Sequence, residues 1–264
     1  MATRSGSEFE LWFRGYRPAV AGAPRLLCLP HAGGSATWFA PLAAALAPRT
    51  RVLAVQYPGR QDRYTEPCAD SVGELADRLY QALDGDEGAE APTALFGHSM
   101  GAIIAFELAR RLESAGRAPA VLIASGRRAP STHRAETVHQ RDDQGLIKEL
   151  TSLSGTDASL LRDPEILRMI LPALRSDYRA IETYRRPQGA PLGCPIVAMI
   201  GDRDPKVTVA EAEAWAQETN AGFDLRIYPG GHFYLADRAA EVTGGIEAEL
   251  RRFGCRQAVV TGDH

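Results

Sequence analysis

The most informative stretch of this 264-residue chain is Thr93-Ala-Leu-Phe-Gly-His-Ser-Met-Gly-Ala102. An apolar run typical of a buried strand, 93–96, leads into the pattern G-x-S-x-G, and a helical pattern follows from Ala102 to Arg111. A serine on such a tight turn has a strained backbone and an exposed hydroxyl, while the flanking glycines leave room for neighbouring backbone. The stretch therefore predicts a nucleophile, Ser99, and the alternative is an ordinary turn built from small residues.

The rest of the chain continues the alternation of strand and helix. Five more apolar runs have the length of buried strands: Arg25–Leu29, Arg51–Tyr57, Ala120–Ala124, Pro195–Ile200 and Phe223–Tyr228. Helical patterns at Thr208–Thr219 and Ala236–Phe253 lie between or after them. Continuous apolar strands that alternate with helices are typical of a parallel sheet covered on both faces. The sequence thus predicts an α/β fold with a mostly parallel, doubly wound sheet.

The alternation lapses between about Arg127 and Ala190, where only helical patterns occur. We therefore divide the chain into an α/β core, residues 1–126 and 191–264, and a helical insertion, residues 127–190. On position alone the insertion is either a structural subdomain or a lid over a pocket.

Composition excludes several classes of protein. The chain has 30 basic and 33 acidic residues, a net charge of −3, which argues against a nucleic-acid binder. No apolar run is long enough for a membrane span, and the polar start, Met1–Glu10, lacks a secretion signal, so we expect a cytoplasmic protein. The four cysteines have no metal-ligand spacing, and we expect reduced thiols and no metal or other cofactor. No interface pattern is visible, so we expect a monomer.

A serine nucleophile needs a histidine base and an acid, which in this architecture follow it along the chain in the order acid, then histidine. Position and order favour His232, in the loop after the last predicted strand. The loop Gly201-Asp-Arg-Asp-Pro205 offers two acids, Asp202 and Asp204, which the residues alone do not separate. One oxyanion-hole amide should come from Met100, and the other from the loop Pro30-His-Ala-Gly-Gly34. That loop resembles the His-Gly-Gly-Gly loop of lipases, which makes Ala32 the second donor.

Several motifs in the same order resemble those of type II thioesterases. They are Pro30-His-Ala-Gly-Gly-Ser35, Gln56-Tyr-Pro-Gly-Arg60, Phe96-Gly-His-Ser-Met-Gly101, Leu171-Pro-Ala-Leu-Arg-Ser-Asp-Tyr178 and Pro229-Gly-Gly-His-Phe233. The resemblance implies an α/β-hydrolase fold with a helical lid, and it selects Asp204 as the acid. It also implies hydrolysis of acyl thioesters on the phosphopantetheine arm of acyl or peptidyl carrier proteins, clearing stalled or aberrant groups during polyketide or nonribosomal peptide biosynthesis.

Three other functions stay open at this point. One is a carboxylesterase or lipase, the second is an excised chain-release thioesterase, and the third is a hydrolase-like binding module. No carrier-like stretch precedes the hydrolase pattern, which favours a stand-alone enzyme. Because carrier proteins are usually acidic, Arg127-Arg128 and Arg185-Arg186, which flank the insertion, are candidates for a basic docking face or else an ordinary solvated surface.

Overall fold

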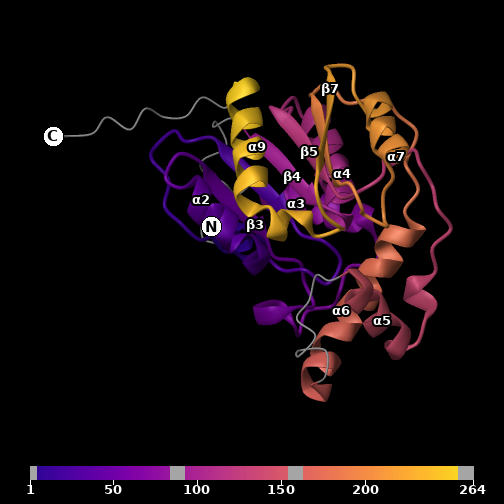
Figure 1. Cartoon of the computed structure of the whole chain (residues 1–264). Coiled ribbons are helices and arrows are strands. Elements are labelled where there is room, and N and C mark those ends of the chain that lie inside the picture. The colour runs from indigo at the N-terminus through magenta and orange to yellow at the C-terminus, as the bar shows by residue number, and fades with distance from the viewer. Residues whose placement is uncertain (1–4, 84–92, 154–162, 255–264) are drawn as a thin grey trace.

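The computed structural model describes residues 5–83, 93–153 and 163–254. Within them a seven-stranded sheet has the order β1-β3-β2-β4-β5-β6-β7 (Figure 1). All neighbouring strands are parallel except the pair β1 and β3. The strands are β1 (Phe13–Gly15), β2 (Arg25–Leu29), β3 (Arg51–Val55), β4 (Thr93–His98), β5 (Val121–Ser125), β6 (Ile196–Gly201) and β7 (Phe223–Tyr228). The predicted mostly parallel α/β sheet is confirmed.

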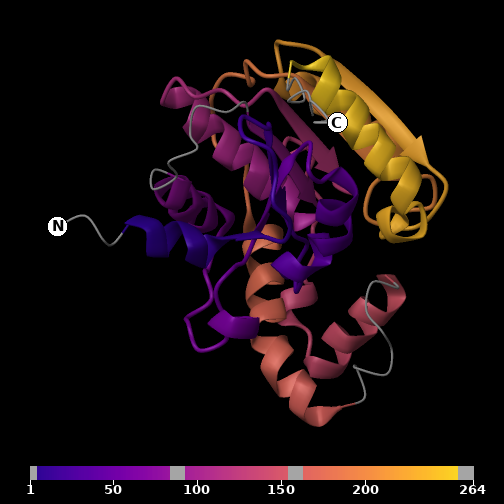
Figure 2. The ribbon, with the colours of Figure 1, turned by 90° about the vertical axis from the view of Figure 1, so that its left-hand side faces the viewer.

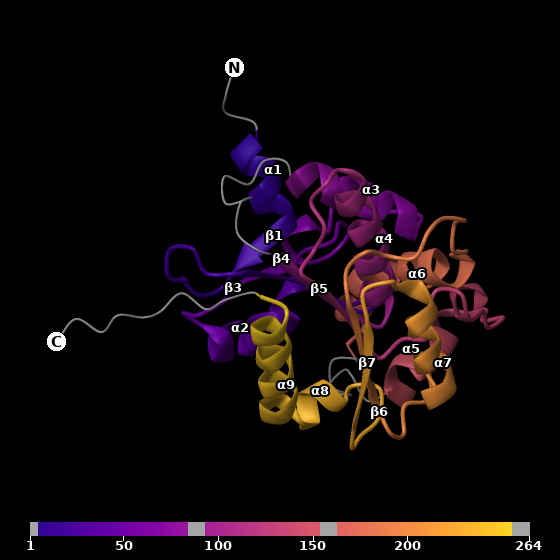
Figure 3. The same cartoon turned by 90° about the horizontal axis from the view of Figure 1, so that it is seen from above.

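Helices cover both faces of the sheet because successive side chains of a strand point to opposite sides. In β2, Leu27 and Leu29 pack into one hydrophobic cluster and Leu26 and Cys28 into the other. Figure 3 shows the two layers on either side of the sheet. The first face carries α1 (Ser5–Trp12), α3 (Val72–Leu83) and α4 (Met100–Ser114), and the second carries α2 (Ala40–Leu46), α8 (Tyr234–Asp237) and α9 (Ala239–Arg252).

Some elements differ from the sequence prediction. The edge strand β1 is missing from it, since three residues paired antiparallel with β3 leave no periodic signal. The helix predicted over Thr208–Thr219 is α7 (Val209–Glu213) followed by a 3₁₀ turn, Ala214–Glu218. In this turn Trp215 is buried, and its indole N–H donates to the backbone carbonyl of Arg127 at 2.8 Å. The last predicted helix is interrupted at Arg238, between α8 and α9.

The segment between β5 and β6 contributes no strand to the sheet within the described residues, and irregular stretches join its helices. It contains a 3₁₀ turn, Val138–Gln140, and the helices α5 (Asp143–Leu153) and α6 (Pro164–Thr183), which lie together below the sheet in Figures 1 and 2. Its own small apolar cluster is formed by Val138, Leu146, Leu171, Leu174 and Tyr178, while Ile181 of α6 packs into the main core. The division at residues 127–190 and the role of a lid stay predictions.

Candidate active site

Ser99 stands on the predicted strained turn between β4 and α4. Its backbone has φ 54° and ψ −115°, a conformation that side-chain-bearing residues rarely adopt. A Cβ on Gly97 would lie 2.2 Å from the Gly101 carbonyl oxygen, and a Cβ on Gly101 would lie 2.1 Å from that of Leu29. Both glycines are therefore required by close backbone approach, as the sequence predicts. The backbone N–H of Ser99 donates to Ser125 in β5 at 2.8 Å, which ties the turn to the sheet.

His232 and Asp204 come together from the loops that follow β7 and β6. The imidazole Nδ1 lies 2.8 Å from Asp204 Oδ2 and 3.0 Å from Oδ1, and both side chains are almost completely buried. Asp204 Oδ1 also accepts the backbone N–H of Lys206 at 2.8 Å. Asp202 instead accepts the backbone N–H of Gly230 at 2.8 Å. Asp202 thus stabilises the backbone of the loop after β7, and Asp204 is the acid that can orient the imidazole.

One pocket brings the predicted site residues together. Ser99, His232, Ala32 and Met100 all line it, with Phe233 beside them. Among the described residues, the hydrogen bonds of the His232 ring run to Asp204, and none joins the ring to the Ser99 hydroxyl. Bonds between a nucleophile and its base are often long before substrate binds. The volume of this pocket is only about 30 Å³, and Leu150, Leu153, Tyr178 and Ile181 of the insertion form part of its wall.

The loop that carries Ala32 is held by a buried ion pair. Asp177, on α6, accepts two hydrogen bonds from the Arg60 guanidinium, at 2.7 and 2.8 Å, and a third from the backbone N–H of Gly33 at 2.8 Å. Arg60 also donates to the Gly34 carbonyl at 3.0 Å. Burial alone would lower the pKa of Arg60, but the Asp177 carboxylate outweighs it and the pKa is raised. Arg60 and Asp177 therefore fix the backbone at Gly33 and Gly34, directly after the candidate oxyanion-hole amide of Ala32.

Two further histidines lie against the site as neutral rings. His98 is fully buried, its Nδ1 lies 2.9 Å from the Ser125 hydroxyl, and its ring centroid is 5.0 Å from that of His232. Burial, reinforced by His232, lowers the pKa of His98 well below its ordinary value. Burial likewise lowers the pKa of His31 to about 3. His31 lines the Ser99 pocket and His98 packs against His232, and neither ring adds positive charge at neutral pH.

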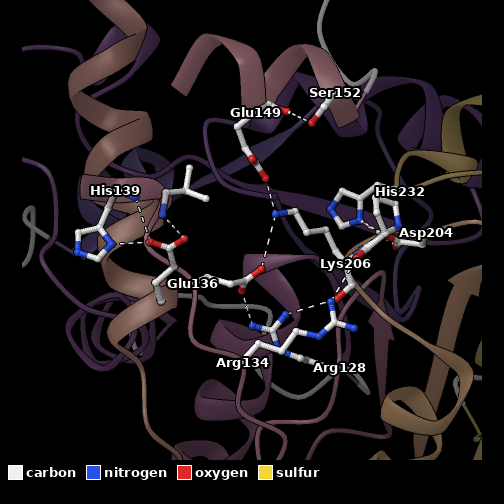
Figure 4. Close-up of polar contacts among 12 residues, drawn as sticks. Arg128, Arg134, Glu136, His139, Glu149, Ser152, Asp204, Lys206 and His232 are labelled. Atoms are coloured by element: carbon white, nitrogen blue, oxygen red, sulfur yellow. Dashed lines mark hydrogen bonds and ion pairs between the residues drawn. The ribbon is translucent and has the colours of Figure 1, made fainter. Parts of the chain in front are cut away.

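A charged network connects the acid loop to the insertion (Figure 4). The Lys206 ammonium pairs with Glu149 of α5 and lies 3.6 Å from Glu136, which also pairs with Arg128. Because Lys206 is two residues from Asp204, this network ties the position of α5 to the loop that bears the acid. This network could not be predicted from the sequence, because its members are isolated charged residues that belong to no motif.

The two arginine pairs do not form the exposed docking face considered from the sequence. Arg127 is 8% exposed and Arg128 is 3% exposed, so both are buried, while Arg185 is exposed. Instead, both pairs line one cavity beside the site.

The described part of the chain offers no metal site and no membrane-spanning helix. No group of three or more His, Cys, Asp or Glu side chains there could hold a metal ion. Cys28, Cys68 and Cys194 are free thiols, while Cys255 lies outside the described residues. None of the described helices combines the length and the apolar character needed to span a membrane.

A strained serine follows a central strand and shares one pocket with a histidine that a carboxylate orients. This is the arrangement of α/β-hydrolases, and the chain is a protein of that class. Residues 24–250 match the family described as the thioesterase domain. The chain therefore belongs to the thioesterase family and is a thioester hydrolase, as the sequence motifs indicate.

Close relatives support the more specific resemblance. The chain is 52% identical to a probable cadicidin biosynthesis thioesterase of Streptomyces griseus, covering 90% of this chain but only 66% of that protein. It is 50% identical to the thioesterase PikA5 of Streptomyces venezuelae, covering 91% and 85%. The solved structure of BorB, a type II thioesterase from the borrelidin biosynthetic cluster, is 52% identical, with a TM-score of 0.85 over 91% of this chain and 98% of that chain. The predicted resemblance to type II thioesterases is thereby confirmed.

Proposed function

We propose that this enzyme hydrolyses acyl thioesters from the phosphopantetheine arm of acyl or peptidyl carrier domains, removing stalled or aberrant acyl groups in polyketide or nonribosomal peptide biosynthesis. The observation that carries the proposal is the pocket shared by the strained Ser99 and by His232, whose Nδ1 is bonded to Asp204. The similarity to BorB and PikA5 supports the choice of a thioester over an oxygen ester.

In the proposed cycle Ser99 Oγ attacks the thioester carbonyl carbon while His232 Nε2 takes the hydroxyl proton. Asp204 holds the imidazole in the required tautomer and stabilises the imidazolium. The backbone N–H groups of Ala32 and Met100 donate to the oxyanion. The carbon–sulfur bond then breaks, and the pantetheine sulfur takes the proton from His232. Water, deprotonated by His232, attacks the acyl-serine, the carboxylic acid leaves, and the proton returns to Ser99.

The proposal assigns residues 127–190 as a lid. A pocket of about 30 Å³ has room for one or two water molecules, so an acyl group enters only if the side chains of α5 and α6 move. The cycle uses side chains, backbone amides and water, and we propose no cofactor. We further propose a cytoplasmic monomer, which light scattering of the purified enzyme would test.

The decisive experiment compares acyl-pantetheine thioesters with matched oxygen esters in the wild type and in Ser99→Ala. We expect preferential thioester hydrolysis, and loss of activity in the variant without loss of fold. Preference for oxygen esters would indicate a carboxylesterase, and wild-type inactivity on both would indicate a binding module. Mass spectrometry of carrier-bound acyl chains before and after enzyme addition would identify the groups removed, and a cyclised product would indicate chain release.

The two aspartates of the acid loop provide a matched pair of variants. Asp204→Asn should lower kcat by about 10⁴-fold, because the amide favours the wrong imidazole tautomer. Asp202→Asn should leave kcat nearly unchanged, since that carboxylate contacts the Gly230 backbone and not the imidazole. A larger loss in Asp202→Asn than in Asp204→Asn would reverse the assignment.

A further inference from the structure

A second cavity, of about 310 Å³, lies beside the Ser99 pocket. The two share three wall residues, Arg127, Ile181 and Glu182, so they are neighbouring spaces. The exposed Arg185 stands at the second cavity, which therefore reaches from solvent to the wall of the active site. Its lining is strongly basic, with six residues that carry or can carry positive charge: Arg127, Arg128, His133, Arg134, Arg185 and Arg186.

Three of the five arginines have their charge balanced by a carboxylate. Arg128 pairs with Glu136, Arg134 with Glu211 and Arg186 with Glu218. The side chains of Arg127 and Arg185 have no carboxylate partner among the described residues.

Arg185 donates only to backbone carbonyls, those of Glu182 and Tyr184. The one carboxylate that lines the cavity, Glu182, is engaged by His139 and by the backbone N–H groups of Val138 and His139. Two cationic groups therefore remain available to a ligand.

Arg127 is the less ordinary of the two, because it is 92% buried. Its side-chain Nε has no hydrogen-bond partner within the described part of the chain. Burial, with a smaller contribution from Arg128, lowers the pKa of Arg127 to about 10, so the group is still charged at neutral pH. The carboxylates of Glu136 and Glu182 attract this charge, but neither forms an ion pair with the guanidinium within the described residues. A buried cation without a contacting counter-charge is destabilising, and an anionic ligand would supply that contact.

We propose that this cavity binds the phosphate of the carrier's phosphopantetheine arm, with Arg127 and Arg185 as its principal ligands. The inference rests on the proposed function and adds the residues that would recognise the arm. Phosphate suits arginine because the guanidinium fork donates two parallel hydrogen bonds to it. An acyl chain suits this cavity poorly, because burying alkyl groups against five guanidinium groups would desolvate charge. The phosphate therefore occupies the basic cavity and the thioester the neighbouring Ser99 pocket.

The test compares two substrates that differ only in phosphate, an acyl-pantetheine and the same acyl-4′-phosphopantetheine. For the wild type we expect kcat/KM to be about tenfold or more higher for the phosphorylated substrate, as one charge-assisted contact would give. The advantage should lie mainly in KM and shrink at high salt. Inorganic phosphate should compete only with the phosphorylated substrate.

Two variants and one control locate the effect. Arg127→Met, which keeps a similar length of apolar side chain, should bring the ratio of the two kcat/KM values close to one. Arg185→Gln should lower the ratio several-fold. Arg168→Gln is the matched control, because Arg168 is an exposed arginine of α6 and does not line the cavity. It should leave the ratio unchanged, and thermal unfolding of each variant checks that it is folded.

The outcomes separate this inference from the proposed function. Equal kcat/KM for both substrates in a wild type that hydrolyses them would overturn the phosphate site and leave thioester hydrolysis standing. A phosphate advantage that survives in both Arg127→Met and Arg185→Gln would place the phosphate elsewhere and overturn the assignment. Failure to hydrolyse either substrate would contradict the proposed function itself.

Discussion

Replacing Asp177 with asparagine tests whether the insertion controls the oxyanion-hole loop. The carboxylate accepts three hydrogen bonds, two from Arg60 and one from the backbone N–H of Gly33, and the side chains of the ion pair are only 8% and 3% exposed. Asp177→Asn keeps the shape but leaves the buried guanidinium without a counter-charge. Breaking such a pair costs about 3–5 kcal/mol, which for a chain of this size lowers Tm by roughly 6–20 °C.

The same substitution should also slow catalysis. Without the anionic acceptor, the Gly33 N–H is held less firmly, and the adjacent Ala32 amide loses its alignment. Loss of one oxyanion-hole donor typically lowers kcat by about 10²–10³-fold. We would measure Tm by calorimetry and kcat on an acyl-pantetheine thioester at saturating substrate.

Two further variants separate the stability effect from the positioning effect. In the double variant Arg60→Met/Asp177→Leu no buried charge is left unpaired, so we expect Tm near that of the wild type but a kcat that is still low. The control is Asp70→Asn, which breaks the pair between Asp70 and Arg179 of the same helix, where the side chains are 71% and 50% exposed. An exposed pair is worth less than about 1 kcal/mol. Control of the oxyanion-hole loop by Asp177 would be refuted if Asp177→Asn loses no more stability than this control, or if the double variant has the turnover of the wild type.

Three other predictions follow from local geometry. Gly101→Ala should prevent folding or lower Tm sharply, because its Cβ would lie 2.1 Å from a backbone oxygen. Gly244→Ala has open space at a helical position, so its free energy of unfolding should rise by up to about 1 kcal/mol. Equal Tm values for the two variants would contradict this. The pKa of His31 is lowered from 6.5 to about 3, and that of His98 is also lowered, so as the pH falls the unfolded chain binds protons before the folded one. Urea unfolding should therefore show stability falling as the pH drops from about 6.5 toward 3. A flat profile would count against neutral buried rings. Asp163→Ala should cost about 1 kcal/mol, since Asp163 caps α6 by accepting a backbone N–H at 2.8 Å, and unchanged chemical denaturation would exclude a capping role.

Much of the fold could be predicted from the sequence because its signals are local. A buried strand is visible as a short apolar run. The turn at Ser99 requires glycines at 97 and 101, because a Cβ at either position would meet neighbouring backbone. Four of the six predicted strands agree with the structure to within one residue at each end. The run 93–96 stops two residues before the end of β4 at His98, and the run Arg51–Tyr57 continues two residues past the end of β3 at Val55. The order of elements was then sufficient to favour His232 over the other histidines.

The contacts that complete the site are between residues far apart in the chain, and a single sequence holds no record of such distances. The aspartates at 202 and 204 are equivalent by pattern, and only packing aims Asp204 at His232. The motifs ending at Arg60 and containing Asp177 were recognised separately, but their pairing across 117 positions depends on how α6 lies on the core. Likewise, an arginine such as Arg127 is expected at the surface from its residue type, but the tertiary structure buries it. Local patterns therefore determined the elements and the nucleophile, whereas burial and charge pairing were decided by the tertiary structure, because both depend on which distant segments exclude water from each other.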